Sequence, residues 1–275
     1  MNSFLGGAFR AEARTDIPSY TRTFGVLPEP LPLMEYNYDR GKTNPNQIED
    51  GYYMACRGYT LADIAGDIDD AVYDHKGTYD RLSAYEGHSI EKGGMIMDAL
   101  NFGCVEGLLQ LHETTEAEAK KHIRGKPFYV DKVPGYDWFD SHCLALRKAK
   151  IPISCGTIWF FEWMNPPDNG ILTSNFVFDG TWDSEMGHNY KISGEKTING
   201  EPTLCVKAWL GRWFYMNRKT FNKAFDIYGT GSWIQPKFSP KDVLYVKLTI
   251  FQRILQLVSR YISTSVAKKF PQFYL

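Results

Sequence analysis

The sequence predicts an α+β protein, with a mainly helical first half and a strand-rich second half. After the turn signal Asp50-Gly51, apolar residues recur at helical spacing, as at Leu61, Ile64 and Ile68. From Ile151 onwards the pattern changes to short apolar runs rich in β-branched and aromatic residues, which are typical of strands. Helices followed by strands indicate two segregated lobes rather than alternating βαβ units.

The composition excludes several classes of protein. The chain has 275 residues, of which 43% are hydrophobic and 15% aromatic, enough for one large domain or two small lobes. Its formal net charge is −1, so we expect no nucleic-acid partner. We find no signal-peptide pattern and no apolar run of about eighteen residues, so we expect a protein of the cytoplasm or of a virion, without a membrane span.

The five cysteines are odd in number and scattered, and no pair has the spacing of a zinc site. We therefore expect buried, reduced thiols that act as small hydrophobic residues, and neither a metal nor a cofactor. Reduced thiols are typical of a reducing compartment, or of a particle assembled in one. The five are Cys56, Cys104, Cys143, Cys155 and Cys205.

Residues 1–35 are expected to form an extended N-terminal arm. Gly6-Gly7 gives a flexible start, and the alternating prolines Pro28, Pro30 and Pro32 favour extended backbone. Such an arm either moves freely or lies on a neighbouring protein.

Residues 36–238 are expected to form the main domain, with a helical lobe over about 36–130. We predict a first helix from near Tyr53 to about Asp74, a second one beginning near Ser89, and a polar helix over Thr114 to Ile123.

Residues 131–238 are expected to form the strand-rich lobe. A helix is predicted over Phe139 to Lys148, and strands over Ile151 to Phe160, Tyr190 to Ser193 and Thr203 to Trp209. Asn199-Gly200 is a hairpin signal between the last two strands.

Several short motifs occur in an order that resembles the papain-like cysteine peptidases. They are Asn46-Gln47 before the first helix, Gly93-Gly94, Gly187-His188, and Val206-Lys207 followed by Trp209. Each motif alone is weak, but their order extends over roughly residues 35–235. The resemblance implies a two-lobe fold, with the Gly93-Gly94 segment lining one wall of the substrate cleft.

The resemblance also implies which positions carry the chemistry. A papain-like site needs a thiolate, a histidine base, an asparagine that orients the histidine, and a glutamine at the oxyanion. Gln47 and His188 match. When the family's nucleophile segment is laid on Gly51–Cys56, its cysteine falls on Tyr53, and its asparagine falls on Ala208 or Lys207. We therefore expect a catalytically inactive member, a pseudo-peptidase in which Gln47, Tyr53 and His188 are vestigial.

Two further comparisons with the family bear on this expectation. Asp50 and Glu91 stand where the family has a disulfide, which agrees with a reduced protein. Cys56 falls almost one helical turn after Tyr53, at a position that is a buried phenylalanine in the family, so we interpret it as packing. Two alternatives stay open: an active peptidase, amidase or acyl transferase with a displaced nucleophile, which needs a cysteine within about 3–4 Å of His188, and an adaptor that binds peptides in an inactive cleft.

The pattern of residues 239–275 predicts a C-terminal amphipathic helix, with Ser239 as its N-cap and Pro240 at its first position. Its apolar seam advances in alternating steps of four and three, which is a heptad pattern. The seam could pack on its own domain or on another subunit, and its regularity disfavours a membrane surface. The seam residues are Leu244, Leu248, Phe251, Leu255, Val258 and Ile262.

An arm and a heptad helix on an inactive domain are attachment devices. We therefore expect a structural component of a large assembly, with a bacteriophage virion, in its head–tail or baseplate region, as the first hypothesis. The partners would be other protein subunits or further copies of the chain, bound through the arm and the helix.

Overall fold

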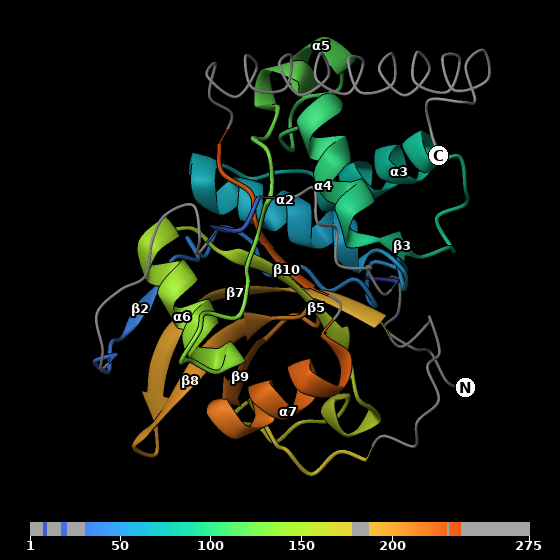
Figure 1. The fold of residues 1–275 in the computed structure, drawn as a ribbon. Helices are drawn as coiled ribbons and strands as arrows, with labels where there is room; N and C mark the ends of the chain where they lie inside the picture. Colours follow the sequence, from blue (N-terminus) through green and yellow to red (C-terminus); the bar gives the residue numbers. More distant parts are fainter. Residues whose placement is uncertain (1–7, 10–17, 21–30, 178–186, 230, 238–275) are drawn as a thin grey trace, which may run out of the picture. The chain divides into compact units, whose positions relative to one another are not determined.

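The computed structural model describes residues 8–9, 18–20, 31–177, 187–229 and 231–237 (Figure 1). The predicted C-terminal helix with its seam, and most of the predicted arm, lie outside these residues. None of the described helices is long and apolar enough to cross a membrane.

An eight-stranded, mostly antiparallel sheet organises the second half of the chain. Its order is β4-β10-β5-β7-β8-β9-β6, and β2 pairs with β7 outside this path. The long β7 and β8 form a hairpin through Asn199 and Gly200, both at positive φ, as the Asn-Gly signal predicted. The bounds are β2 (Tyr36–Asn37), β4 (Phe128–Tyr129), β5 (Ile153–Ile158), β6 (Ile171–Leu172), β7 (Gly187–Ile198), β8 (Glu201–Lys207), β9 (Trp213–Asn217) and β10 (Gly231–Ile234).

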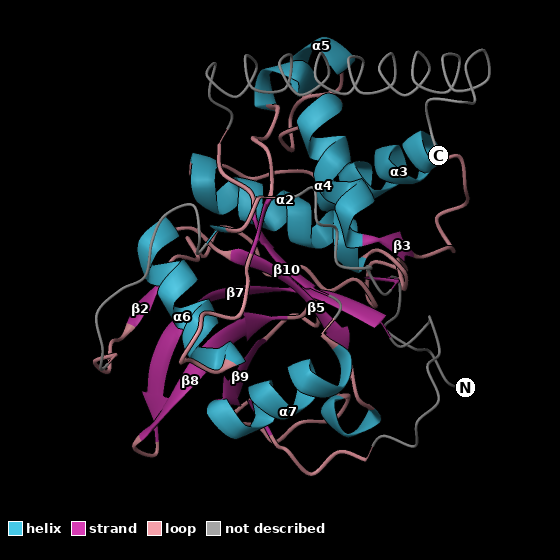
Figure 2. Ribbon diagram, viewed as in Figure 1, coloured by secondary structure: helices cyan, strands magenta, loops and turns pink. Residues whose placement is uncertain are grey.

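Six α-helices are described, and five of them fall into two groups (Figure 2). The helices α2 (Cys56–Asp69), α3 (His75–Glu86) and α4 (Ile96–Val105) pack on one another, and α2 also lies against β5 and β7. The helices α6 (Trp138–Ala149) and α7 (Arg218–Tyr228) pack together on the sheet. The short α5 (Glu116–Ala119) continues into the 3-10 helix η1 (Lys120–His122), and η2 (Phe161–Trp163) follows β5.

The first helix is shorter at both ends than the predicted Tyr53 to Asp74. Tyr53 and Met54 lie in a turn, and α2 begins at Cys56. It ends at Asp69, and the cap residue Asp70 has a left-handed φ of 55°, after which the Ala71 N–H bonds to the carbonyl of Gly66. The prediction of a helix start at Ser89 was wrong, because the Ser89 hydroxyl accepts the Glu91 N–H in a turn and α4 begins only at Ile96.

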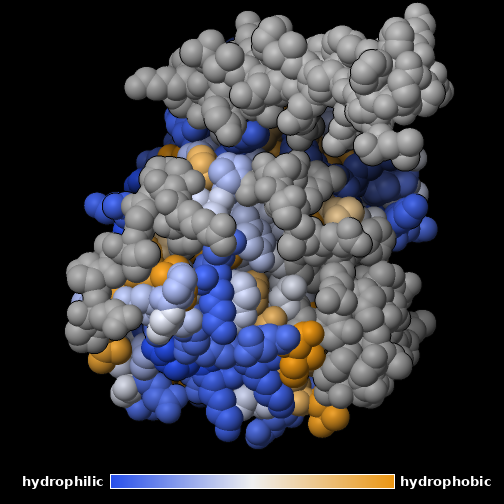
Figure 3. All heavy atoms as spheres, viewed as in Figure 1, coloured by the Kyte–Doolittle hydropathy of each residue, from blue (hydrophilic) through white to orange (hydrophobic). Residues whose placement is uncertain are grey.

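Two hydrophobic cores are present, one on each group of helices. One core lies between the sheet, α6 and α7, and includes Phe139, Ile192 and Phe221. The other is built by α2, α3 and α4 and also takes in Trp209 and Trp233 from the second half of the chain. In the view of Figure 3 the described surface is mostly hydrophilic, and its hydrophobic residues show as small separate spots. Most apolar residues of the described part of the chain are therefore buried in the two cores.

Candidate functional site

Cys56 is the first residue of α2, and this helix end points at the beginning of β7. Its Sγ accepts a hydrogen bond of 3.4 Å from the backbone N–H of Asn189, the residue that follows His188. Cys56 and His188 are both fully buried. A cysteine at a helix N-terminus lies in the positive field of the helix dipole and close to free backbone N–H groups, which is a setting that favours a thiolate.

Tyr53, the residue expected at the nucleophile position, is not part of α2. It lies in a turn before α2, with 46% of its surface exposed, and its carbonyl accepts the Gln47 side-chain amide at 2.9 Å. The loop between Gln47 and the helix contains Tyr53. It folds into successive turns, closed by Asp50 N–H to Asn46 O and by Tyr52 N–H to Gln47 O. The helix therefore begins at Cys56, three residues after Tyr53.

His188 opens β7 and has a defined tautomer. Its Nε2 lies 3.3 Å from the carbonyl oxygen of Ala208. A carbonyl can only accept, so Nε2 carries the proton and Nδ1 of the neutral ring keeps its lone pair. The indole of Trp159 packs edge-on against the imidazole, with ring centroids 5.0 Å apart.

The expected loss of the orienting asparagine therefore does not leave the imidazole unsupported. The backbone carbonyl of Ala208, one of the two residues expected at that position, supplies an acceptor of the kind that an asparagine side chain would supply. Lys207 points elsewhere and joins a buried charge cluster. Sequence reasoning overlooked the backbone as a source of acceptors.

A set of hydrogen bonds fixes the start of α2 to the strand that carries His188. The Thr60 hydroxyl donates to Cys56 O at 2.7 Å and lies 3.1 Å from Asn189 O. The indole N–H of Trp209 lies 2.9 Å from Asn189 O and 3.1 Å from Thr60 Oγ1. Trp209 has a φ of 58°, rare for a large residue, and its own carbonyl accepts Gln47 N–H. Four segments distant in sequence thus meet around Cys56.

Burial dominates the titration of the thiol. It raises the pKa of Cys56 to about 11, against the lowering by the backbone N–H of Asn189 and by the positive charge of Arg57. The thiol is therefore protonated at neutral pH in this closed arrangement. The groups around it favour the thiolate, so opening the site to water would lower its pKa.

A short N-terminal strand lies beside this site. β1 (Ala8–Phe9) pairs in parallel with β3 (Gly94–Met95) and also contacts β7. Gly94 belongs to the Gly-Gly segment predicted to line a cleft wall, and an adjoining pocket of about 380 Å³ extends to Tyr85 and Asp98. The β3 edge therefore accepts an extended chain through its backbone.

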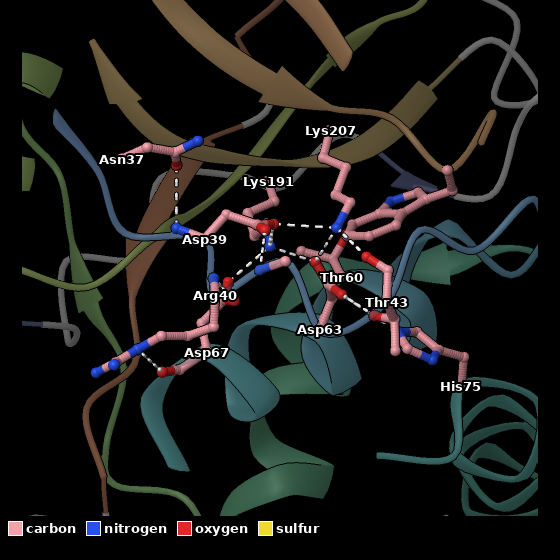
Figure 4. Close-up of polar contacts among 12 residues, drawn as sticks. Asn37, Asp39, Arg40, Thr43, Thr60, Asp63, Asp67, His75, Lys191 and Lys207 are labelled. Atoms are coloured by element: carbon pink, nitrogen blue, oxygen red, sulfur yellow. Dashed lines mark hydrogen bonds and ion pairs between the residues drawn. The ribbon is translucent and has the colours of Figure 1, made fainter. Parts of the chain in front are cut away.

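A second cluster of functional-looking side chains lies between α2 and the sheet (Figure 4). The Lys191 ammonium on β7 pairs with the carboxylates of Asp39, Asp63 and Asp67, at 2.6 Å for Asp67. Lys207 on β8 lies 3.0 Å from Asp39. The three carboxylate oxygens lie within 4.8 Å of one another, a spacing that could suit a metal ion. Because two ammonium groups already lie among these carboxylates, the cluster fits a structural link between α2 and the sheet.

All five cysteines are free thiols. Cys155 is buried in β5, and its Sγ accepts the Ser232 hydroxyl at 3.2 Å. Burial raises the pKa of its thiol to about 12, and no described carboxylate or imidazole is bonded to it.

No protein-family model and no curated protein sequence matches the chain. Solved structures do. Xylellain, a cysteine protease from Xylella fastidiosa, superposes with a TM-score of 0.62 at 13% identity, covering 86% of this chain and 98% of that one. Digestive procathepsin L 3 from Tenebrio molitor larval midgut gives 0.57 at 12% identity, covering 85% and 77%. Procathepsin B S9 from Trypanosoma congolense gives 0.52 at 10% identity, covering 84% and 87%.

These findings correct the expectation that the chain is a pseudo-peptidase. That expectation rested on Tyr53 at the nucleophile position, whereas α2 begins with Cys56. The solved structures that resemble the chain are cysteine proteases. At these identities the likeness is one of fold, and the chain has the two-lobe α+β fold of the papain-like cysteine proteases.

Proposed function

We propose that the protein is a cysteine-dependent hydrolase that cleaves peptide bonds, with Cys56 as nucleophile and His188 as general base. One observation carries the proposal: the first residue of α2 is a cysteine whose Sγ reaches the His188-Asn189 backbone of β7. The Nε2 bond to Ala208 O supports it, because this bond leaves the basic lone pair on Nδ1.

The reaction follows from these roles. His188 takes the proton of the Cys56 thiol, and the thiolate attacks the carbonyl carbon of the peptide bond. The tetrahedral intermediate collapses when His188 returns the proton to the leaving amine, which gives a thioester on Cys56. Water, deprotonated by His188, then attacks the thioester, releases the acid and restores the thiol.

The oxyanion of the intermediate needs hydrogen-bond donors. The backbone N–H of Cys56 is at the N-terminus of α2, where helix N–H groups have no partner within the helix. A side-chain amide has two N–H groups, and Gln47 uses one of them on Tyr53 O. Its second N–H is suited to the oxyanion role.

The β3 edge favours a peptide as substrate over a small amide. It holds an extended chain by backbone pairing, which recognises any peptide in extended form. In this structure β1 contacts both β3 and β7, and Cys56 and His188 are buried, so a substrate would have to displace β1.

The test compares Cys56→Ala and His188→Ala with the parent chain, using fluorescein-labelled casein and a peptidyl epoxide probe. We expect the parent to react with the epoxide at Cys56, located by peptide mass mapping, and both variants to lose labelling and casein cleavage. Cys104→Ala is the matched control, because Cys104 is a half-buried thiol bonded to Gly125 O and should not matter. Labelling that persists in Cys56→Ala would refute the assignment.

The assembly role predicted from the sequence, as a virion component attached through the arm and the C-terminal helix, is a separate prediction. It is compatible with a working hydrolase, because the predicted attachment segments lie at the two ends of the chain.

A further inference from the structure

Arg57, the residue directly after Cys56, is a fully buried charge in the first turn of α2. Its guanidinium forms two parallel bonds to Glu86 at the end of α3, Nη1 to Oε1 at 2.6 Å and Nη2 to Oε2 at 3.0 Å. Nη1 also donates to the carbonyl of Met95 at 3.1 Å. One side chain therefore links the start of α2, the end of α3 and the strand β3.

The guanidinium lies directly under the backbone of β3. A Cβ placed on Gly94 would come within 2.6 Å of Arg57 Nη1 and 2.7 Å of its Cζ. The glycine is thus required by the arginine rather than by a turn. The strand that pairs with β1 rests on the residue next to Cys56, so the position of this edge is set by Arg57.

The charge of Arg57 also acts on the thiol. It is among the influences that lower the pKa of Cys56 against burial. The opposing charge is Glu86, which also contacts His88 Nε2 at 2.5 Å. The Tyr79 ring packs against the same turn, and its hydroxyl donates to Lys92 O. Arg57 and Glu86 should therefore influence Cys56 with opposite signs.

Resting on the proposed function, we propose that Arg57 is a positioning residue for the reaction: it holds the peptide-binding edge β3 in place relative to Cys56, and its positive charge stabilises the thiolate. Two separable consequences follow. Substrate binding depends on the geometry of the planar guanidinium, which makes two bonds to the Glu86 carboxylate and one bond to Met95 O. Thiolate formation depends on the charge alone.

Three variants separate these consequences: Arg57→Met, Arg57→Lys and Glu86→Gln. The thiolate is followed by the rate of Cys56 alkylation with iodoacetamide between pH 5 and 10, resolved by peptide mapping, and binding by the KM for labelled casein. For Arg57→Met we expect a Cys56 pKa at least one unit higher, so that alkylation at pH 7 is about tenfold slower, together with a raised KM. Arg57→Lys should restore the alkylation profile but not the KM, because an ammonium cannot form the fork.

Glu86→Gln should lower the Cys56 pKa and speed alkylation at pH 7, the opposite of Arg57→Met. A merely structural role predicts that all three variants change in the same direction, and that result would overturn the proposal, as would an unchanged alkylation profile and KM in Arg57→Met. Arg81→Lys is the control, since the Arg81 guanidinium donates to the carbonyls of Gly107 and Glu106 after α4 and lies over the Phe102 ring, away from β3. If Arg57→Met does not fold, Arg57→Lys and Glu86→Gln still decide. Alkylation tests Arg57 even if the parent cleaves no casein, so failure of the proposed hydrolase activity remains distinguishable.

Discussion

At the scale of single residues, the buried charges between α2 and the sheet differ in what they contribute. Burial disfavours the ionised form of Asp63, but Lys191, His75 and Lys207 hold its pKa well below the ordinary value. Burial raises the pKa of Asp67 to about 6, against the lowering by Lys191. Three carboxylates face two ammonium groups, and Asp67 is the surplus acid.

The signs of the two linkages are therefore opposite. The pKa of Asp63 is depressed in the folded state, so its contribution to stability is present above its unfolded pKa of about 3.9 and is lost as the pH falls below it. The pKa of Asp67 is raised, so the folded state binds its proton more tightly, and stability is lost as the pH rises from about 4 to about 6.

We predict that Asp63→Asn is strongly destabilising and Asp67→Asn is not. Asp63→Asn removes the carboxylate that Lys191, Lys207 and His75 all approach, and it should lower the free energy of unfolding by about 3–5 kcal/mol at pH 7.5. Asp67→Asn removes only the surplus charge, should be neutral or stabilising at pH 7.5, and should flatten the pH dependence of stability between pH 4 and 6.5. Urea unfolding followed by tryptophan fluorescence measures both. Equal losses in the two variants would show that the assignment of the surplus charge is wrong.

At the scale of elements, sequence periodicity predicted the helices and strands whose formation depends on local sequence patterns. The strand β5, the β7–β8 hairpin with its Asn-Gly turn, and α6 fall where the apolar runs and turn residues placed them. The helices α3 and α7 were missed. The segment His75–Glu86 is polar and contains Gly77, and α3 owes its start to the Asp74 side chain, which accepts the Gly77 N–H. Its few buried residues, such as Tyr79 and Leu82, are buried because they pack in the core that α3 shares with α2 and α4, which the local sequence does not reveal.

The same contrast between local patterns and distant contacts explains which residues of the candidate site could be predicted. Gln47 and His188 could be found because they belong to short motifs. The start of α2 could not, because it depends on how many residues the loop after Gln47 uses in turns. The sequence contains one indication of Arg57, a charged residue beside the apolar face of a predicted helix. Its partners Glu86 and Met95 lie far along the chain, so their contacts with Arg57 could not be predicted from a local pattern. The β1–β3 pairing joins segments more than eighty residues apart, beyond any local pattern.

The β1 strand also gives a prediction. Deleting residues 1–17 removes the strand that contacts both β3 and β7, while Tyr20, which is buried in the sheet core, is kept. We expect epoxide labelling of Cys56 and casein cleavage to become faster, by about tenfold or more, because the buried thiol becomes accessible and water stabilises its thiolate. Deleting residues 1–5 is the control, since it leaves β1 in place. Unchanged rates in the longer deletion would mean that β1 does not limit access.

At the scale of the whole molecule, the two cores are joined by polar as well as apolar links. Trp209 and Trp233 come from the second half of the chain but pack in the helical core, and Lys191 and Lys207 bind carboxylates of α2. Trp209 belongs both to this junction and to the residues around Cys56, because its indole N–H also lies 2.9 Å from Asn189 O, next to His188. Loss of this junction should therefore impair stability and catalysis together, whereas a segment outside both cores should be separable from both.

The C-terminal segment 239–275 provides the last prediction, which rests on sequence because the segment lies outside the described residues. Its heptad seam should bind a second copy or a neighbouring subunit, and each large side chain buried there would contribute about 1.5–3 kcal/mol, more than an exposed ion pair. We predict that Phe251→Asp with Leu255→Asp abolishes association, measured by light scattering over a range of concentrations, and leaves the thermal unfolding of the domain unchanged. Thr249→Asp with Gln256→Asp adds the same charge on the opposite helix face and should do neither. If deletion of residues 239–275 instead melts the domain without changing its association state, the helix belongs to the core of its own chain.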